Sequence, residues 1–416
     1  MIYTKTFDCG LQFVFRRTRS QVAYSALAIQ SGTRNEPEAH SGIAHMTEHM
    51  LFKGTLRRNP AQISNRLEVL GGELNAYTAK EETVLYSTVL KEDTAKAVDL
   101  LFELAFTSTF PQQELDKERC VVIDEINMYK DSPSECIFEE FERLLFDPSP
   151  LARPILGTTR SLKTIDSAAL HAYVRENFRP ERMCIAIVGN LTPQRAEKIA
   201  LQAVTRSIPA DYRPAMRPPR PVAPAQLPML PMPPVFHKEV SKKNHQINCI
   251  VGTTAFSYYD QRRMEMILLA NLLGGPSANS RLNQLLREKN ALVYSIDASF
   301  TQFADNGSML IYFGCEKPNL DKCLELVHAE LAQMRDKQLS DKALRVAKRQ
   351  LIGQLAVASD NGEAQALSMA KSMLVFGEVM PDEEVRRRIE AITPDSLQRV
   401  ARQVLSEDRL CTLIFK

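Results

Sequence analysis

His45-Met46-Thr47-Glu48-His49 is the most informative segment of this chain of 416 residues. Residues four apart lie one above the other on an α-helix, so the imidazoles of His45 and His49 can bind one metal ion. Glu48 lies near the same face of that helix, where its carboxylate can reach a water molecule at the metal. The segment therefore predicts half of a catalytic zinc site with a general base beside it.

Helix signals surround this segment. Ser41 or Gly42 can begin a helix and Gly54 can end it. A second helix is predicted next, with Asn59 as its N-cap and Pro60 as its first residue. Four apolar residues can bury the first helix against a core, namely Ile43, Met46, Met50 and Leu51.

A catalytic zinc site needs a third protein ligand and an open position. Residues 118–126 read as a helix in which Glu118 and Glu125 are two turns apart and share one face, while Asp124 points about a third of a turn away. Glu125 is a candidate ligand on this spacing. The spacing alone leaves open that both acidic residues are solvated surface.

Three segments together resemble one known family. Residues 31–36 (SGTRNE), 42–55 (GIAHMTEHMLFKGT) and 118–125 (ERCVVIDE) are similar to the M16 (pitrilysin, inverzincin) zinc metallopeptidases. The similarity is greatest to the short bacterial members and to the beta subunit of the mitochondrial processing peptidase, and it extends over most of the chain. It implies one zinc ion per chain, bound by His45, His49 and Glu125. It also implies that Glu118 supports the site without binding the metal itself.

Residues 280–295 resemble the C-terminal Arg/Tyr signature of the same family. Arg287 is expected to end a helix, and Tyr294 to lie on the next strand. The resemblance implies that this pair binds the substrate carbonyl and stabilises the oxyanion, since a guanidinium and a phenol are suitable donors. The alternative is that Arg287 forms an ordinary surface pair with a nearby acid.

Residues 73–77 (ELNAY) resemble the strand of the family that pairs with an extended substrate. Asn75 and Ala76 would bind the substrate backbone, and Phe52 would line a neighbouring side-chain pocket. The alternatives are an ordinary edge strand with a solvated Asn75, and a Phe52 that is part of the core.

A proline-rich stretch divides the chain. Ten prolines occur between Pro209 and Pro234, a density that no helix or central strand tolerates. We expect a zinc-binding catalytic domain at residues 1–208, an extended linker at 209–234 and a homologous domain that carries the Arg/Tyr pair at 235–416.

The two halves look like a duplication. Residues 165–187 match residues 392–414 without a gap, and the strand at 83–90 resembles the strand at 308–313. The predicted fold is α+β, with two homologous domains that each contain a mainly antiparallel sheet packed by helices on one face. By resemblance, the chain forms half of a clamshell, and a homodimer closes it so that each zinc faces Arg287 and Tyr294 of the partner.

Composition excludes several other classes of protein. Hydrophobic residues make up 44% and charged residues 25%, and the net charge of +2 gives no electrostatic reason for binding nucleic acid or an anionic membrane. No apolar stretch is long enough to cross a bilayer. Eight scattered cysteines without a C-x-x-C pattern indicate reduced thiols, and residues 1–8 lack a signal core or an Arg-rich presequence. We therefore expect a cytoplasmic protein.

The sequence thus predicts a zinc-dependent endopeptidase in which Glu48 is the general base and the substrates are extended peptides. Three alternatives stay open: a non-catalytic scaffold of the same fold, a subunit that depends on an unlike partner, and a structural zinc protein. Structural zinc usually takes four closed ligands including Cys, and none of the cysteines is spaced to join His45 and His49.

Overall fold

The computed structural model describes residues 2–209, 212, 234–242 and 245–416. The chain forms two compact units. The first contains Met1–Asn127, Arg153–Pro221 and Val357–Val379, and the second contains Met128–Ala152, Val222–Ala356 and Met380–Lys416. The expected division into 1–208 and 235–416 therefore differs from the structure by two exchanged segments. The expected linker at 209–234 lies almost entirely outside the described residues.

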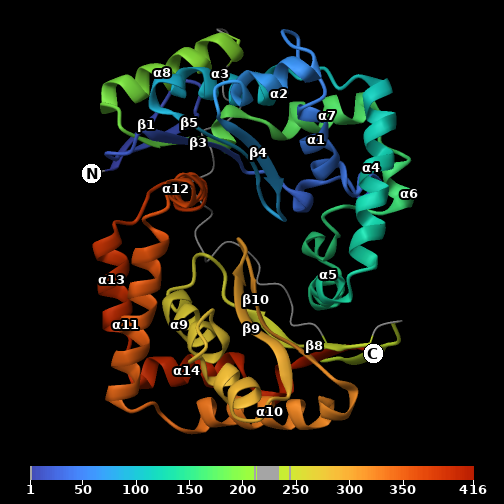
Figure 1. Ribbon diagram of the computed structural model, residues 1–416, viewed down its shortest axis with the longest axis vertical. Coiled ribbons are helices and arrows are strands. Elements are labelled where there is room, and N and C mark those ends of the chain that lie inside the picture. The colour runs from blue at the N-terminus through green and yellow to red at the C-terminus, as the bar shows by residue number, and fades with distance from the viewer. Residues whose placement is uncertain (1, 210–211, 213–233, 243–244) are drawn as a thin grey trace. The chain divides into compact units, whose positions relative to one another are not determined.

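The first unit contains a mixed sheet of mainly antiparallel strands (Figure 1). Its order is β1-β2-β6-β3-β5-β4, and only β2 and β6 run parallel to each other. The strands are β1 (Ile2–Thr6), β2 (Gln12–Arg17), β3 (Val22–Ile29), β4 (Glu73–Thr78), β5 (Thr83–Leu90) and β6 (Met183–Gly189). This order places β4 at one edge of the sheet.

The second unit repeats this topology. Its sheet order is β7-β11-β8-β10-β9, with β7 and β11 parallel and the other pairs antiparallel. The strands are β7 (His237–Val240), β8 (Ile247–Ala255), β9 (Val293–Gln302), β10 (Gly307–Cys315) and β11 (Cys411–Phe415). Taken in chain order, β2 to β6 and β7 to β11 occupy the same places, so the predicted pair of homologous α+β domains is confirmed, and β1 is an addition to the first.

The gapless match between the halves is also visible in the helices. Helix α7 (Ser167–Asn177) precedes β6 as α14 (Pro394–Val404) precedes β11. Both helices begin at a side-chain cap, in which Asp166 accepts from the N–H of Ala169 and Thr393 from that of Ser396. The same local chemistry therefore starts the same element in both units.

Helices cover one face of the first sheet. They are α1 (Ile43–Leu51), α2 (Pro60–Glu68), α3 (Thr94–Thr107), α7 and α8 (Pro193–Ser207). Phe13 and Phe15 of β2 point into this core, while Val14 between them points to the opposite face, as the two-residue period of a strand requires. The long helix α4 (Gln112–Lys130) contributes Leu115 and Val122 to the same core.

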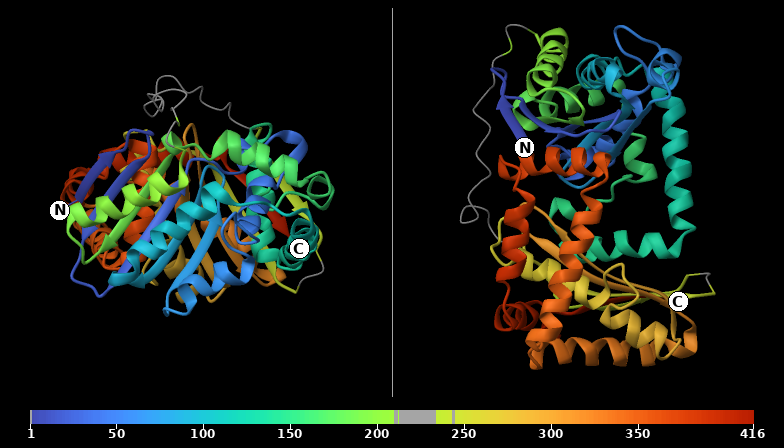
Figure 2. Two further views of the ribbon diagram at one scale, coloured as in Figure 1. Left: turned by 90° about the horizontal axis from the view of Figure 1, so that it is seen from above. Right: turned by 60° about the vertical axis from the view of Figure 1, so that its left-hand side comes forward.

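The opposite face of the first sheet is covered by a helix from the far end of the chain. Helix α12 (Gly362–Phe376) lies against this face (Figure 2, right). Its buried Met369 and Met373 belong to one apolar cluster with Ala26 of β3 and Ala186 of β6. The expectation of helices on one face only is therefore wrong. The reason is that β3 and β6 are apolar on both faces, so each face must be buried.

The second unit likewise contains a helix from the other half of the chain. Helix α5 (Pro133–Phe146) buries Ile137 and Phe141 against β8 and β11, on the face opposite the helices α9 (Arg263–Gly274), α10 (Leu320–Asp336) and α14. Gly252 of β8 has no room for a side chain, since a Cβ there would lie 2.7 Å from Leu310 of the neighbouring strand and 3.1 Å from the ring of Phe141. The remaining helices are α6 (Thr159–Leu162), α11 (Asp341–Ala358) and α13 (Asp382–Ala391).

Candidate metal centre

Helix α1 carries the H-x-x-E-H segment as predicted. It begins after Gly42, whose positive φ of 91° suits glycine, and it ends at Leu51, with Gly54 in the following loop. Helix α2 follows with Asn59 as its N-cap and Pro60 at its first position, also as predicted. The four apolar residues expected to anchor α1 are buried, namely Ile43, Met46, Met50 and Leu51.

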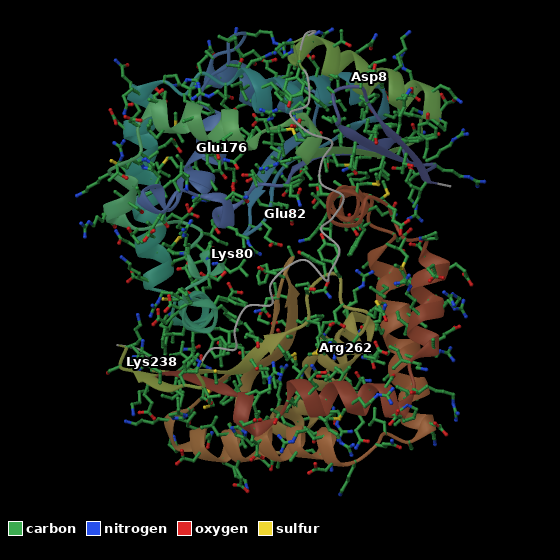
Figure 3. All side chains as sticks on the ribbon, turned by 180° about the vertical axis from the view of Figure 1, so that it is seen from behind. Asp8, Lys80, Glu82, Glu176, Lys238 and Arg262 are labelled. Atoms are coloured by element: carbon green, nitrogen blue, oxygen red, sulfur yellow. The ribbon has the colours of Figure 1, made fainter. Side chains whose placement is uncertain are left out.

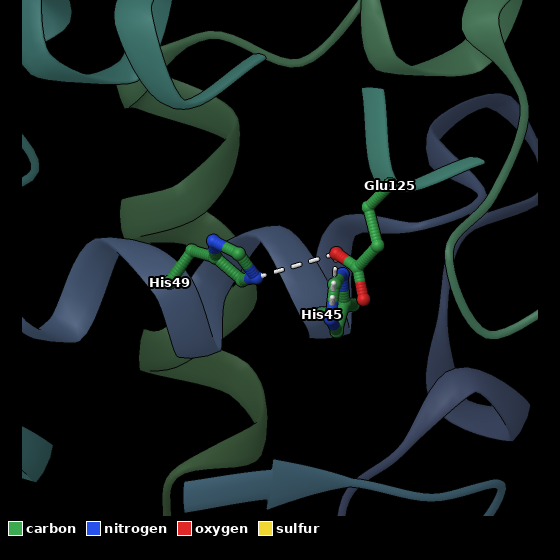
Figure 4. A group of neighbouring side chains, drawn as sticks. All are labelled: His45, His49 and Glu125. Carbon is green, nitrogen blue, oxygen red and sulfur yellow. Dashed lines mark ion pairs between the residues drawn. The ribbon is translucent and has the colours of Figure 1, made fainter. Parts of the chain in front are cut away.

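The three predicted ligands meet in space. His45, His49 and Glu125 each offer an atom that lies within 4.8 Å of the other two. The Nε2 atoms of His45 and His49 lie 3.8 and 3.7 Å from Oε2 of Glu125 (Figure 4). The two rings are 4.6 Å apart between centroids, one turn apart on α1, and Glu125 reaches them from α4.

This donor set fits zinc. Two imidazole nitrogens and one carboxylate oxygen make a three-ligand site of the catalytic kind, with room for a fourth ligand. The nitrogen–oxygen separations exceed a hydrogen bond and approach the roughly 3.4 Å expected between two ligands of a tetrahedral zinc ion. Within the described part of the chain, no other cluster of His, Cys, Asp or Glu has such spacing.

The two histidines are held differently. His49 has its Nδ1 3.0 Å from Oε2 of Glu118, so that Nε2 is left for a metal. His45 is buried, and its Nδ1 has no hydrogen-bond partner among the described residues. Burial, followed by the neighbouring charge of His49, lowers the pKa of His45 to about 3, so its imidazole is neutral at physiological pH, as a metal ligand must be.

Glu118 is supported in turn by Lys53. The Lys53 ammonium lies 2.5 Å from Oε1 of Glu118, on the oxygen that His49 does not use. Burial acts to raise the pKa of Glu118, but hydrogen bonds from Lys53 and His49 outweigh it and hold the pKa below its ordinary value. Glu118 therefore stays ionised and can orient the His49 ring.

Glu48 connects helix α1 to strand β4. The Thr78 hydroxyl, at the end of β4, donates a 2.6 Å hydrogen bond to Oε2 of Glu48. Burial raises the pKa of Glu48, although this bond and the charge of His49 oppose the shift. A carboxylate with a raised pKa is better matched to accept a proton near neutral pH.

The predicted substrate-binding residues lie close by in the first unit. β4 pairs with β5 alone among the described strands, so its other edge is open to a further strand. Asn75 is exposed on β4, Ala76 is half-buried, and Phe52 at the end of α1 is half-buried against the core.

Arg287 and Tyr294 belong to the second unit. Arg287 is exposed in the last turn of a π-helical segment, Asn283–Glu288, and Tyr294 is on β9, so the predicted helix and strand are both present. The Tyr294 side chain is 65% exposed, and its hydroxyl donates to Oε1 of Glu316 at 3.2 Å.

Sequence reasoning missed Lys53, Thr78 and a third residue, Glu36, which contacts the start of α1. Lys53 follows His49 by four residues, a spacing that hinted at a shared side of the chain. Thr78 is two residues after Ala76 on β4, so both side chains point to the face that carries α1, as the strand period requires. None of the helices in the described part of the chain is long and apolar enough to span a membrane.

Comparisons with known proteins identify the family of this chain. The family model described as Insulinase (Peptidase family M16) matches residues 13–159, and the model described as Peptidase M16 inactive domain matches residues 164–351. A protein of Streptomyces coelicolor described as an uncharacterized zinc protease is 32% identical over 374 residues, which cover 90% of this chain and 80% of the relative. An uncharacterized zinc protease of Bacillus subtilis is 28% identical, with 93% and 91% covered.

Solved structures share the fold. A protease from Helicobacter pylori superimposes with a TM-score of 0.90 at 18% identity and covers 100% of this chain and 99% of its own. A Pseudomonas fluorescens protein described as a peptidase M16 inactive domain gives a TM-score of 0.88 at 21% identity, with 100% and 97% covered. The match of both family models and the identity to the Streptomyces relative place this chain in peptidase family M16.

Proposed function

We propose that this chain is a zinc-dependent endopeptidase that hydrolyses extended peptides or unfolded segments. The observation that carries the proposal is the position of Glu48, which is on the same helix as His45 and His49 and is tied by Thr78 to an open strand edge. A peptide bound at that edge as a further strand would pass beside a general base and a metal site.

Each residue has a distinct role in this proposal. A zinc ion held by His45, His49 and Glu125 would act as a Lewis acid on the peptide carbonyl and would lower the pKa of a water molecule. Glu48 would take the proton of that water through the carboxylate oxygen that Thr78 leaves free, and would deliver it to the leaving amine.

The substrate would be oriented by the edge strand. Backbone groups on the open side of β4 would pair with the peptide, with Asn75 and Ala76 along its path and Phe52 beside a substrate side chain. Extended segments are favoured because a folded helix or sheet cannot offer its backbone groups to this edge.

Arg287 and Tyr294 would complete the site as donors to the oxyanion. We propose that they come from the partner in a homodimer, because the proposed metal ligands and this pair lie on different units of one chain. Eight free cysteines support a reducing, cytoplasmic location.

The test is Glu48→Gln, which keeps the size of the side chain but removes the proton acceptor. The variant should bind zinc like the wild type and lose about 10²–10⁴-fold in kcat/KM on an unstructured, fluorescently quenched peptide. Glu114→Gln, at a half-buried residue of α4 that pairs with Lys117, is the matched control and should remain active. Near-normal turnover by zinc-loaded Glu48→Gln would contradict the role of Glu48. A zinc-loaded wild-type chain that cleaves no peptide would instead favour the scaffold or unlike-partner alternative.

A further inference from the structure

The start of helix α1 has no cap of its own. The residue before its first turn is Gly42, which has no side chain to accept a hydrogen bond, and the first turn contains no acidic residue. The first N–H groups of any helix lack partners within the helix, and burying them unpaired is costly. The helix that carries two proposed metal ligands therefore depends on another segment for its start.

Glu36 supplies the missing acceptors from six residues upstream. Its Oε2 accepts from the N–H of Gly42 and its Oε1 from the N–H of Ala44, both at 2.9 Å. Glu36 is only 5% exposed, so these bonds are shielded from water. His45 is the residue that follows Ala44, so the second of these bonds fixes the backbone directly beside a proposed ligand.

Glu36 is itself held in place. The Arg153 guanidinium donates to the Glu36 carbonyl, and the Arg153 carbonyl accepts from the Lys80 ammonium at 2.6 Å. The loop before Glu36 also bonds to the turn between β4 and β5, since the N–H groups of Thr33 and Arg34 donate to the carbonyls of Ala79 and Lys80. Figure 3 labels Lys80 and Glu82 of this turn.

These hydrogen bonds connect the helix of the proposed metal ligands to the strand end that holds Glu48. The turn at residues 79–82 directly follows Thr78, which holds the general base Glu48. The loop of Glu36 is bonded to that turn, and the Glu36 carboxyl is bonded to the first turn of α1. The helix with the ligands and the strand end that holds the base are thus set by one hydrogen-bonded loop.

We propose that Glu36 is a positioning residue for the metal site, because it fixes the first turn of α1 so that His45 and His49 face Glu125. The inference rests on the proposed zinc site but assigns Glu36 no contact with metal or substrate. Gly42 cannot substitute for this cap through a side chain of its own, since a Cβ there would lie 2.7 Å from the Leu156 carbonyl and its φ is positive.

The experiment measures zinc affinity of folded protein by competition with a chelator, together with the visible spectrum of the cobalt-substituted form. Glu36→Gln retains one acceptor oxygen but turns an amide N–H₂ toward the other backbone donor. We expect its zinc dissociation constant to rise about 10–100-fold and its cobalt spectrum to change, as happens when partners of metal ligands are lost.

Two matched controls separate positioning from general stability. Glu181→Gln removes a carboxylate that is 7% exposed and bonded to Arg179 and Tyr212 in the same unit. Thr192→Ala removes the side-chain cap of α8. Both should lower the melting temperature and leave zinc affinity and the cobalt spectrum unchanged.

The outcomes are distinguishable. A Glu36→Gln chain that binds zinc like the wild type, with only a lower melting temperature, would overturn the positioning role and leave the zinc peptidase proposal intact. A wild-type chain that binds no zinc would overturn the proposed function itself. If Glu36→Gln does not fold, Arg153→Met takes its place. This variant removes the hydrogen bond to the Glu36 carbonyl but keeps the Glu36 carboxyl that caps α1. Its zinc dissociation constant should rise by less than that of Glu36→Gln, and an unchanged value would overturn the inference.

Discussion

The two units share one strand order but place different chemistry on it. Along the chain of the first unit, α1 and α2 come between β3 and the edge strand β4. Along the chain of the second, α9 and the segment Asn283–Glu288 come between β8 and the edge strand β9. Helix α1 carries two histidines and a glutamate, whereas α9 carries mainly apolar residues such as Leu268 and Leu269.

Proposed functional residues of both units lie in or directly after this interval. The proposed metal ligands His45 and His49 are in it in the first unit. In the second unit Arg287 is in it, and Tyr294 follows at the start of β9. The repeated fold therefore places the proposed functional side chains of both units at or next to an edge strand.

Removing a proposed zinc ligand should have the largest effect, because it should abolish the zinc binding that distinguishes the first unit from the second. His49→Ala removes one of three ligands, so we expect zinc affinity to fall beyond about 10³-fold and zinc content to drop from one ion per chain to none. His328→Ala, in the second unit, is the control and should keep one zinc. Metal analysis after dialysis measures both. Full zinc occupancy in His49→Ala would remove the site from the first unit.

Truncation of the exchanged helix in the second unit should affect stability but not the metal. Phe141→Ala leaves a cavity between α5 and β8, which should cost about 3–5 kcal/mol of unfolding free energy. Met373→Ala in α12 is the matched change on the first sheet, at about 2–5 kcal/mol. Chemical denaturation measures both. Equal stability of Phe141→Ala and wild type would mean that α5 does not support the second sheet.

Tyr294→Phe should have the smallest effect of the three, about 100-fold in kcat with zinc affinity unchanged, since one oxyanion donor is lost. The sharper form of the experiment mixes Glu48→Gln chains with Tyr294→Phe chains and allows subunit exchange. If sites are completed in trans, each mixed dimer contains one intact site, and roughly one quarter of wild-type activity should return. Mixed dimers that form but stay inactive would refute the shared site and leave the zinc chemistry untouched.

The sequence predicted those features that depend on local pattern. The limits of β5, the N-cap of α2 and the helix that carries His45 and His49 follow from residue spacing and capping chemistry, which act over a few residues. The resemblance to a known family then selected Glu125, which spacing alone could not separate from a solvated acid.

Features that depend on tertiary packing were not predicted. The amphipathic patterns of α5 and α12 show that one side of each helix is buried, but not against which sheet. The bonds from Thr78 to Glu48 and from Lys53 to Glu118 likewise join segments whose approach is set by the packed core. Such contacts are decided by the whole fold rather than by neighbours in sequence.

The exchange of α5 and α12 has a consequence for how the chain is made. When β6 leaves the ribosome at Gly189, the first sheet has all its strands but one apolar face is still uncovered, and it stays so until α12 has been synthesised. A nascent or truncated chain that stops before Gly362 would expose Ala26, Ala186 and their neighbours to water and to other unfinished chains. The first half of the chain lacks α12 and the second half lacks α5, so neither half alone contains every helix that covers its own sheet.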